Sequence, residues 1–174
     1  MHTPAASGMQ NVLVTGGGGF LGQAIVRALL GRGITVRSFS RKAHEGLRAL
    51  GVEQRQGDLA DAAAVALATR GCDTVFHVAA KPGIWGDYRD YHTANVIGTQ
   101  NVIAACRQHG VPRLVYTSSP SVGFNGSDME GVDESVPYPA HYEAHYPRTK
   151  AIAEQAVIAA NDATLATVSL RPHL

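Results

Sequence analysis

A tyrosine and a lysine four positions apart, Tyr146 and Lys150, form the pair of residues with the clearest chemistry in this chain of 174 residues. On a helix, positions i and i+4 lie on one face. A phenol has a pKa of about 10, which is too high for easy proton exchange at neutral pH, and a neighbouring ammonium favours the phenolate. The spacing therefore predicts that Tyr146 is a general acid and base and that Lys150 lowers its pKa. The alternative is that Tyr146 and Lys150 have no catalytic role and belong to the start of an exposed amphipathic helix.

Two further polar residues are candidates to assist this pair. Ser119 follows the predicted strand Arg113–Ser118, and its hydroxyl is expected to hydrogen-bond a substrate oxygen; Ser118 is the second choice, and turn chemistry before Pro120 is the alternative. Asn95 lies on the apolar stripe of a predicted helix, where an amide is costly unless it is hydrogen-bonded. We expect Asn95 to hold a water or a backbone carbonyl that relays protons to Lys150. The alternative is that the hydrogen bonds of its side chain only stabilise the fold.

A glycine-rich turn follows the first predicted strand and precedes a predicted helix. Gly16 allows a tight turn, Gly19 lets the backbone approach a pyrophosphate, and Gly22 lets the helix pack close to the sheet. Phe20 and Leu21 open the helix, whose free N–H groups and partial positive charge attract phosphates. This context favours a dinucleotide site over a merely flexible turn. Lys150 is then expected to hold the nicotinamide ribose, and an oxidised nicotinamide would further favour the Tyr146 phenolate.

The end of the second predicted strand bears on the choice of dinucleotide. An NAD-binding chain places a carboxylate about 20 residues after the glycines, but none occurs between Gly22 and Glu45. The strand leads instead into Ser40, Arg41 and Lys42, and these cations suit a 2′-phosphate. We therefore favour NADP(H), with NAD(H) as the alternative. Asp58 and Asp61 both stand where the predicted helix Ala60–Thr69 needs an N-cap. Asp58, with Leu59 beside it, either bonds the adenine amino group or only caps this helix.

Apolar runs and helix-period segments alternate along the chain, which predicts an α/β fold with a doubly wound parallel sheet. Residues 1–10 are expected to be a flexible tail and residues 11–174 a Rossmann domain. The predicted strands are Asn11–Thr15, Ile34–Phe39, Val52–Gln56, Asp73–Ala79, Arg113–Ser118 and Ala163–Leu170; the predicted helices are Phe20–Leu30, Ala43–Leu50, Ala60–Thr69, Asp87–His109 and Tyr146–Asn161; Pro120–His145 reads as a long loop.

Composition excludes several classes of protein. Hydrophobic residues make up 45% and charged residues 17%, and the net charge is +1, so a disordered chain, a membrane bundle and a nucleic-acid-binding protein are not expected. Cys72 and Cys106 lie far apart and are expected to be reduced in a cytoplasmic protein, a disulfide being the less favoured alternative. The eight histidines are scattered, so no metal site is predicted.

Several motifs together are similar to those of the extended short-chain dehydrogenase/reductase family. They are TGGGGFLG, GDL, HVAAK, NVIGTQNV, YTSS, YPRTK and SLRP, between Asn11 and Pro172. The resemblance implies a Rossmann domain and a Ser-Tyr-Lys triad with an assisting Asn, at Ser119, Tyr146, Lys150 and Asn95. It also implies that Ala79, Ala80 and Lys81 line the nicotinamide side of the cofactor.

The segments HVAAKPGIWGDY and YTSSPSVGF resemble the 3β-hydroxysteroid dehydrogenase-like branch of that family. This likeness implies a hydrophobic 3-oxo or 3-hydroxy acid as substrate, either a 2-alkyl-3-oxoalkanoic acid or a sterol bearing a 4-carboxylate. It also implies a homodimer, and relatives of about twice this length whose second half builds a substrate domain that this chain lacks. A nucleotide-sugar epimerase or dehydratase and a non-catalytic NADP-binding module are the alternatives.

Overall fold

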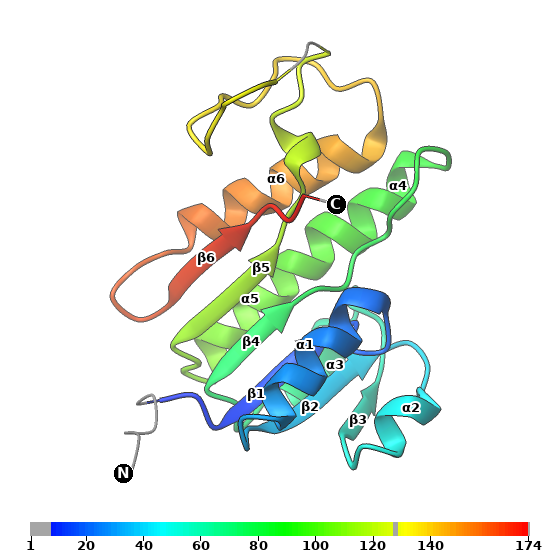
Figure 1. Ribbon diagram of the computed structural model, residues 1–174, viewed down its shortest axis with the longest axis vertical. Helices are drawn as coiled ribbons and strands as arrows, with labels where there is room; N and C mark the ends of the chain where they lie inside the picture. The colour runs from blue at the N-terminus through cyan, green and yellow to red at the C-terminus, as the bar shows by residue number, and fades with distance from the viewer. Residues whose placement is uncertain (1–7, 127–128, 174) are drawn as a thin grey trace.

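Six parallel strands form one sheet at the centre of the computed structural model, which describes residues 8–126 and 129–173. The strands are β1 (Asn11–Thr15), β2 (Thr35–Ser40), β3 (Glu53–Gln56), β4 (Thr74–His77), β5 (Arg113–Thr117) and β6 (Ala166–Leu170). Their order in the sheet is β3-β2-β1-β4-β5-β6 (Figure 1). This order is that of a Rossmann fold and confirms the predicted doubly wound sheet.

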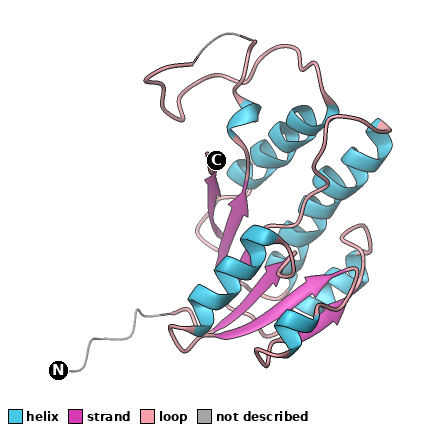
Figure 2. Ribbon diagram, turned by 45° about the vertical axis from the view of Figure 1, so that its right-hand side comes forward, coloured by secondary structure: helices cyan, strands magenta, loops and turns pink. Residues whose placement is uncertain are grey.

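Helices cover both faces of the sheet (Figure 2). They are α1 (Phe20–Leu30), α2 (Glu45–Arg48), α3 (Ala62–Thr69), α4 (Tyr88–Tyr91), α5 (Gly98–Gln108) and α6 (His145–Ala159), with a π-helix η1 (His92–Ile97) and a 3-10 helix η2 (Pro120–Val122). In β1, Val12 and Val14 join the apolar cluster under α1, while Leu13 joins the cluster under α3, α5 and α6. Successive strand residues point to opposite faces, so a strand buried on both sides is apolar throughout.

The predicted helix Asp87–His109 is one continuous helical run with an unpredicted change of pitch. Its middle turns, η1, form a π-helix between α4 and α5, and Asn95 lies inside it. Extra residues of this kind in a helix are often found at functional sites. The pitch change therefore draws attention to Asn95 independently of its residue type.

Other boundaries differ from the predictions by a few residues. Asp61, and not Asp58, caps α3, because its carboxylate accepts hydrogen bonds from the N–H groups of Ala63 and Ala64. The predicted loop Pro120–His145 contains the short helix η2, while its residues 127 and 128 lie outside the described residues. Of the predicted tail, residues 1–7 are outside them too, and Gln10 is hydrogen-bonded to Asp73.

Two expectations from composition concern the described residues as a whole. Cys72 and Cys106 are both free thiols, as predicted. In residues 8–126 and 129–173, no helix combines the length and the apolar character that crossing a membrane requires.

Candidate cofactor cleft and catalytic site

A cleft of about 880 Å³ opens at the carboxyl ends of β1 and β4. These strands are neighbours at the point where the strand order reverses, which is where open α/β sheets bind ligands. Most of the residues that the sequence predicts to bind a cofactor line it: Gly16, Gly19, Phe20, Leu21, Gly22, Ser40, Arg41, Asp58, Leu59, Ala79, Ala80 and Lys81. Segments that are distant in the sequence line the same cleft because the parallel strands that they follow all end at one edge of the sheet.

Two positions of the glycine turn, Gly16 and Gly22, do not accommodate a residue with a Cβ atom. A Cβ on Gly22 would lie 2.1 Å from the carbonyl oxygen of Gly16, and Gly16 itself has a φ of +69°. In the described part of the chain no side chain caps α1, whose first residues line the cleft, and the first N–H groups of a helix have no intrahelical partner. A backbone cradle with free donors fits a pyrophosphate. The exposed Phe20 and Leu21 stand at its rim.

Arg41 and Lys42 follow β2, and the sequence predicts that both bind a 2′-phosphate, but the structure places them differently. Arg41 lines the cleft and is exposed, whereas Lys42 lies outside the lining, in the turn where its carbonyl accepts the Ser40 hydroxyl at 2.8 Å. Of these two cations, Arg41 is therefore the one that can reach a ligand in this cleft. The predicted contact from Lys42 stays a prediction.

Asp58 and Leu59 lie on the same rim, after β3. The carboxylate of Asp58 accepts the N–H of Ala60 at 2.9 Å, which holds the turn. The predicted alternative, that Asp58 caps α3, is wrong because the helix begins later and Asp61 supplies the cap. An adenine contact by Asp58 stays a prediction.

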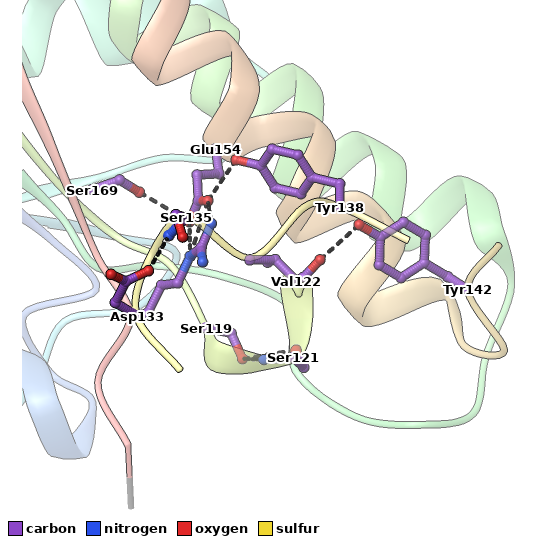
Figure 3. Close-up of polar contacts among 10 residues, drawn as sticks. Ser119, Ser121, Val122, Asp133, Ser135, Tyr138, Tyr142, Glu154 and Ser169 are labelled. Atoms are coloured by element: carbon purple, nitrogen blue, oxygen red, sulfur yellow. Dashed lines mark hydrogen bonds and ion pairs between the residues drawn. The ribbon is translucent and has the colours of Figure 1, made fainter. Parts of the chain in front are cut away.

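Tyr146 and Ser119 come together although they lie far apart in the sequence. Burial raises the pKa of Tyr146 above its ordinary value, and a hydrogen bond with Ser119 opposes this effect. Ser119 in turn shares a hydrogen bond of 2.8 Å with the hydroxyl of Ser121 on η2 (Figure 3). Ser118, the second choice from the sequence, is buried, and its hydroxyl has no hydrogen-bond partner among the described residues. Ser119 is therefore the serine that accompanies the tyrosine.

Lys150 is almost completely buried one helical turn after Tyr146. Its ammonium donates to the carbonyl oxygen of Thr117 at 2.6 Å and lies 4.1 Å from the centre of the Tyr116 ring. Burial lowers its pKa to about 7, with the charge of Glu154 acting in the opposite direction. The ammonium is therefore held at the end of β5, where its charge responds to small changes in its surroundings.

Asn95 links the cleft wall to the helix that carries Tyr146 and Lys150. Its side-chain oxygen accepts the N–H of Lys81 at 2.7 Å, and its amide donates to the carbonyl of Lys81 at 3.2 Å and to the hydroxyl of Thr149 at 3.1 Å. Asn95 thus holds a backbone carbonyl, one of the two partners expected for it. A proton relay to Lys150 stays a prediction.

Replacing Asn95 with leucine is expected to lower the free energy of unfolding by about 2–4 kcal/mol, because the half-buried N–H and carbonyl of Lys81 lose their side-chain partner and the buried Thr149 hydroxyl loses one of its hydrogen bonds. Chemical denaturation measures the change. The matched control is Asn161→Ala, which removes one exposed hydrogen bond to the N–H of Thr167 and should cost less than about 1 kcal/mol. Equal losses in the two variants would contradict the bracing role of Asn95.

A buried histidine that the sequence did not single out joins the same region. His77 ends β4, its Nδ1 lies 2.7 Å from the Thr15 hydroxyl, and its Nε2 lies 3.0 Å from that of Thr99. The Thr15 oxygen also accepts the N–H groups of Val78 and Ala79. Burial lowers the pKa of His77 to about 3, with a smaller contribution from Lys150, so the ring is neutral. His77 therefore fixes the ends of β1 and β4 to each other.

The loop after β4 completes the cleft. Lys81 lies 3.5 Å from the carboxylate of Asp90 and 5.2 Å from the centre of the Tyr91 ring. The lining also includes residues that sequence reasoning missed: Phe39, Gly57, Val78, Pro82, Arg89, Asp90, Thr93 and Ala94. Four of them belong to the helix whose irregular pitch was not visible in the sequence.

The residues of the cleft fit a dinucleotide better than a metal ion. The glycine cradle provides backbone donors for phosphates, and Arg41 provides a guanidinium. In the part of the chain that the structure describes, no three histidine, cysteine, aspartate or glutamate side chains cluster in a way that could hold a metal.

Comparison with known proteins agrees with this geometry. Residues 13–174 match the 3-beta hydroxysteroid dehydrogenase/isomerase family. The chain belongs to this family. The 2-alkyl-3-oxoalkanoate reductase of Stenotrophomonas maltophilia is 58% identical over 165 residues, which cover 94% of this chain and 50% of that protein. The mouse (Mus musculus) sterol-4-alpha-carboxylate 3-dehydrogenase, decarboxylating, is 40% identical over 92% of this chain and 44% of the relative.

A solved structure extends the likeness to the fold. The UDP-glucose 4-epimerase of Thermus thermophilus in complex with NAD is 32% identical, with a TM-score of 0.81, over 93% of this chain and 54% of the epimerase. The chain therefore spans about half the length of the proteins it matches. Membership of the 3-beta hydroxysteroid dehydrogenase/isomerase family agrees with the resemblance stated from the motifs.

Proposed function

We propose that this chain binds NADP(H) and carries the catalytic residues of an oxidoreductase that interconverts a 3-oxo and a 3-hydroxy group. The observation that carries the proposal is the meeting of Ser119 with Tyr146, with Lys150 one turn further along α6. A phenol, a hydroxyl and an ammonium match the needs of carbonyl reduction, and Asn95 links the helix that carries the phenol and the ammonium to the wall of the cofactor cleft.

The nicotinamide supplies a hydride to the carbonyl carbon when the cofactor is bound. Ser119 holds the carbonyl oxygen, and Tyr146 gives that oxygen its phenolic proton, so a ketone becomes an alcohol. Lys150 stabilises the negative charge that this transfer leaves on Tyr146. Ser121 accepts or donates a hydrogen bond at Ser119 and so orients the serine hydroxyl. In the oxidation direction, the same groups act in reverse.

A preference for NADP(H) over NAD(H) is the finer part of the proposal. Arg41 in the cleft and the absence of a carboxylate between Gly22 and Glu45 both support it. A guanidinium can bind the 2′-phosphate with two hydrogen bonds, whereas a carboxylate there would repel it.

Replacing Arg41 with alanine is expected to raise the Kd for NADPH by about tenfold to a hundredfold, because hydrogen bonds to a charged group are lost. The Kd for NADH should change little, since NADH has no 2′-phosphate. Fluorescence titration measures both constants. Arg48→Ala, which removes an exposed arginine paired with Glu45, serves as the control. A similar loss of NADH binding would contradict the assignment of Arg41.

The proposed substrate is a hydrophobic 3-oxo acid, either a 2-alkyl-3-oxoalkanoic acid or a sterol carrying a 4-carboxylate. The names of the two relatives described above support these classes. A homodimer and a cytoplasmic location also remain predictions, which size-exclusion chromatography with light scattering and cell fractionation would test.

One assay compares this function with its alternatives. The purified protein is mixed with NADPH and either a 2-alkyl-3-oxoalkanoic acid or a UDP-sugar, and nicotinamide absorbance and product are followed. Oxidation of NADPH with the oxo acid alone supports the proposal. Conversion of the UDP-sugar would support the epimerase alternative, and cofactor binding without turnover of any substrate would support a non-catalytic module.

A further inference from the structure

A buried carboxylate lies on α6 one helical turn beyond Lys150. Glu154 is 1% exposed and Lys150 is 2% exposed, and the i, i+4 spacing places them on one face of the helix. The proposed reaction gives Glu154 no part. A carboxylate buried to this extent is costly unless it is paired, so its surroundings must be considered first.

Three side chains hold Glu154 through four donor atoms, and Figure 3 labels two of these side chains, Tyr138 and Ser169. The Tyr138 hydroxyl donates to it at 2.6 Å, Ser169 on β6 donates at 3.2 Å, and Arg171 donates from Nε at 3.1 Å. A second nitrogen of Arg171 bonds the same carboxylate. Burial raises the pKa of Glu154, but the hydrogen bonds from Arg171 and Tyr138 and the positive charge of Arg171 outweigh it and leave the pKa below its ordinary value. Glu154 is therefore ionised at neutral pH.

The other groups that face Lys150 are uncharged. Its direct partners are a backbone carbonyl and the face of an aromatic ring. Among the described residues, the titratable groups near it are His77 from β4, whose pKa its charge lowers, Tyr116 from β5, whose ring it contacts, and Tyr146, one turn earlier on α6. Burial lowers the pKa of His77 and raises the pKa values of both tyrosines, so all three are neutral at pH 7. Glu154 is the ionised group that acts on the ammonium, and its charge favours the protonated form.

We propose that Glu154 is a positioning residue for Lys150: its carboxylate, held by Arg171, keeps charged the buried ammonium that lies one helical turn from Tyr146. This inference rests on the proposed function, in which the ammonium stabilises the Tyr146 phenolate. This role explains why α6 carries a buried carboxylate paired with Arg171, where two apolar side chains would pack at a lower cost in free energy. The pair also attaches Tyr138, from the segment between η2 and α6, to the same charge.

The small number of lysines makes the charge of Lys150 directly measurable. The chain has only Lys42, Lys81 and Lys150, so protein labelled with ¹³C at the lysine ε-carbon gives few signals, and Lys150→Met assigns the one of interest. In Glu154→Gln, the titration midpoint of Lys150 is expected to fall by about one pH unit, as for a unit charge removed within about 10 Å in a medium of effective dielectric constant about 20. Glu154→Asp, which keeps the charge, should restore most of the midpoint.

Two further variants separate charge from structure. Asp162→Asn removes a carboxylate from the exposed ion pair with Arg107 and should leave the Lys150 midpoint unchanged. If an unpaired Arg171 prevents folding of Glu154→Gln, as judged by circular dichroism, the double variant Glu154→Gln/Arg171→Gln is compared with Arg171→Gln alone, because this pair of variants differs only in the Glu154 charge. An unchanged Lys150 midpoint in folded Glu154→Gln, or equal midpoints in the double variant and in Arg171→Gln alone, would overturn the proposal. Because no cofactor or substrate is needed, a protein without reductase activity would contradict the proposed function and leave this measurement valid.

Discussion

Replacing Tyr146 with phenylalanine is expected to lower the turnover rate by about a hundredfold to ten-thousandfold and to leave the Kd for NADPH almost unchanged. The phenylalanine keeps the ring and the packing at the start of α6 but removes the proton donor, and positioned proton donors contribute rate factors of this size. Initial rates of NADPH oxidation with a 2-alkyl-3-oxoalkanoic acid and a fluorescence titration of cofactor binding measure the two quantities.

The matched control for this change is Tyr88→Phe. Tyr88 contacts the His92 and His145 rings and the Arg148 guanidinium through its aromatic ring, and these contacts survive the loss of the hydroxyl. Its rate should stay within about threefold of the unsubstituted protein, as expected for a surface change away from the reacting groups. A normal turnover rate in Tyr146→Phe would contradict the proposed mechanism.

Replacing Gly22 with alanine is expected to weaken cofactor binding by at least about tenfold and to lower the free energy of unfolding by about 1–3 kcal/mol. The new Cβ would lie 2.1 Å from the Gly16 oxygen and 2.8 Å from the Gly17 Cα. Both are backbone atoms, so the turn that forms the phosphate cradle must shift. Titration with NADPH and denaturation with urea measure the two effects.

Gly46→Ala is the comparison that isolates the steric cause. Gly46 lies in α2, and a Cβ there would meet no atom within 4 Å. Alanine favours helices more than glycine does, so this variant should be slightly more stable and should bind NADPH normally. If Gly22→Ala behaved in the same way, the close approach of α1 to the turn would not be what requires glycine.

The fold could be predicted from the sequence because each local signal agreed with the global arrangement. The run Asn11–Thr15 is apolar on both faces, and Gly16 stops it where the chain must turn sharply. Strands of this kind and amphipathic helices in alternation leave few topologies open. The ends of the strands then place Arg41, Ala79 and Ser119 at one edge of the sheet without further information.

The details that were missed depend on contacts between distant segments. The π-helix around Asn95 differs from an α-helix by a shift in hydrogen bonding, and residue periodicity does not reveal it. The Glu154 cluster needs Tyr138 from a segment whose composition indicates only an irregular loop. His77 looks like an ordinary strand residue until Thr15 and Thr99 are seen on either side of it.

Arg41 follows β2 and Ser119 follows β5, and the strand order places β1 and β4 between those two strands. With strands about 4.8 Å apart, the two residues are separated by about 14 Å across the sheet. Substitutions at such a distance and without shared partners usually have additive effects. The proposed preference for one nucleotide cofactor and the proposed reduction of the carbonyl are thus expected to evolve independently. One of these properties can then be re-engineered while the other is conserved.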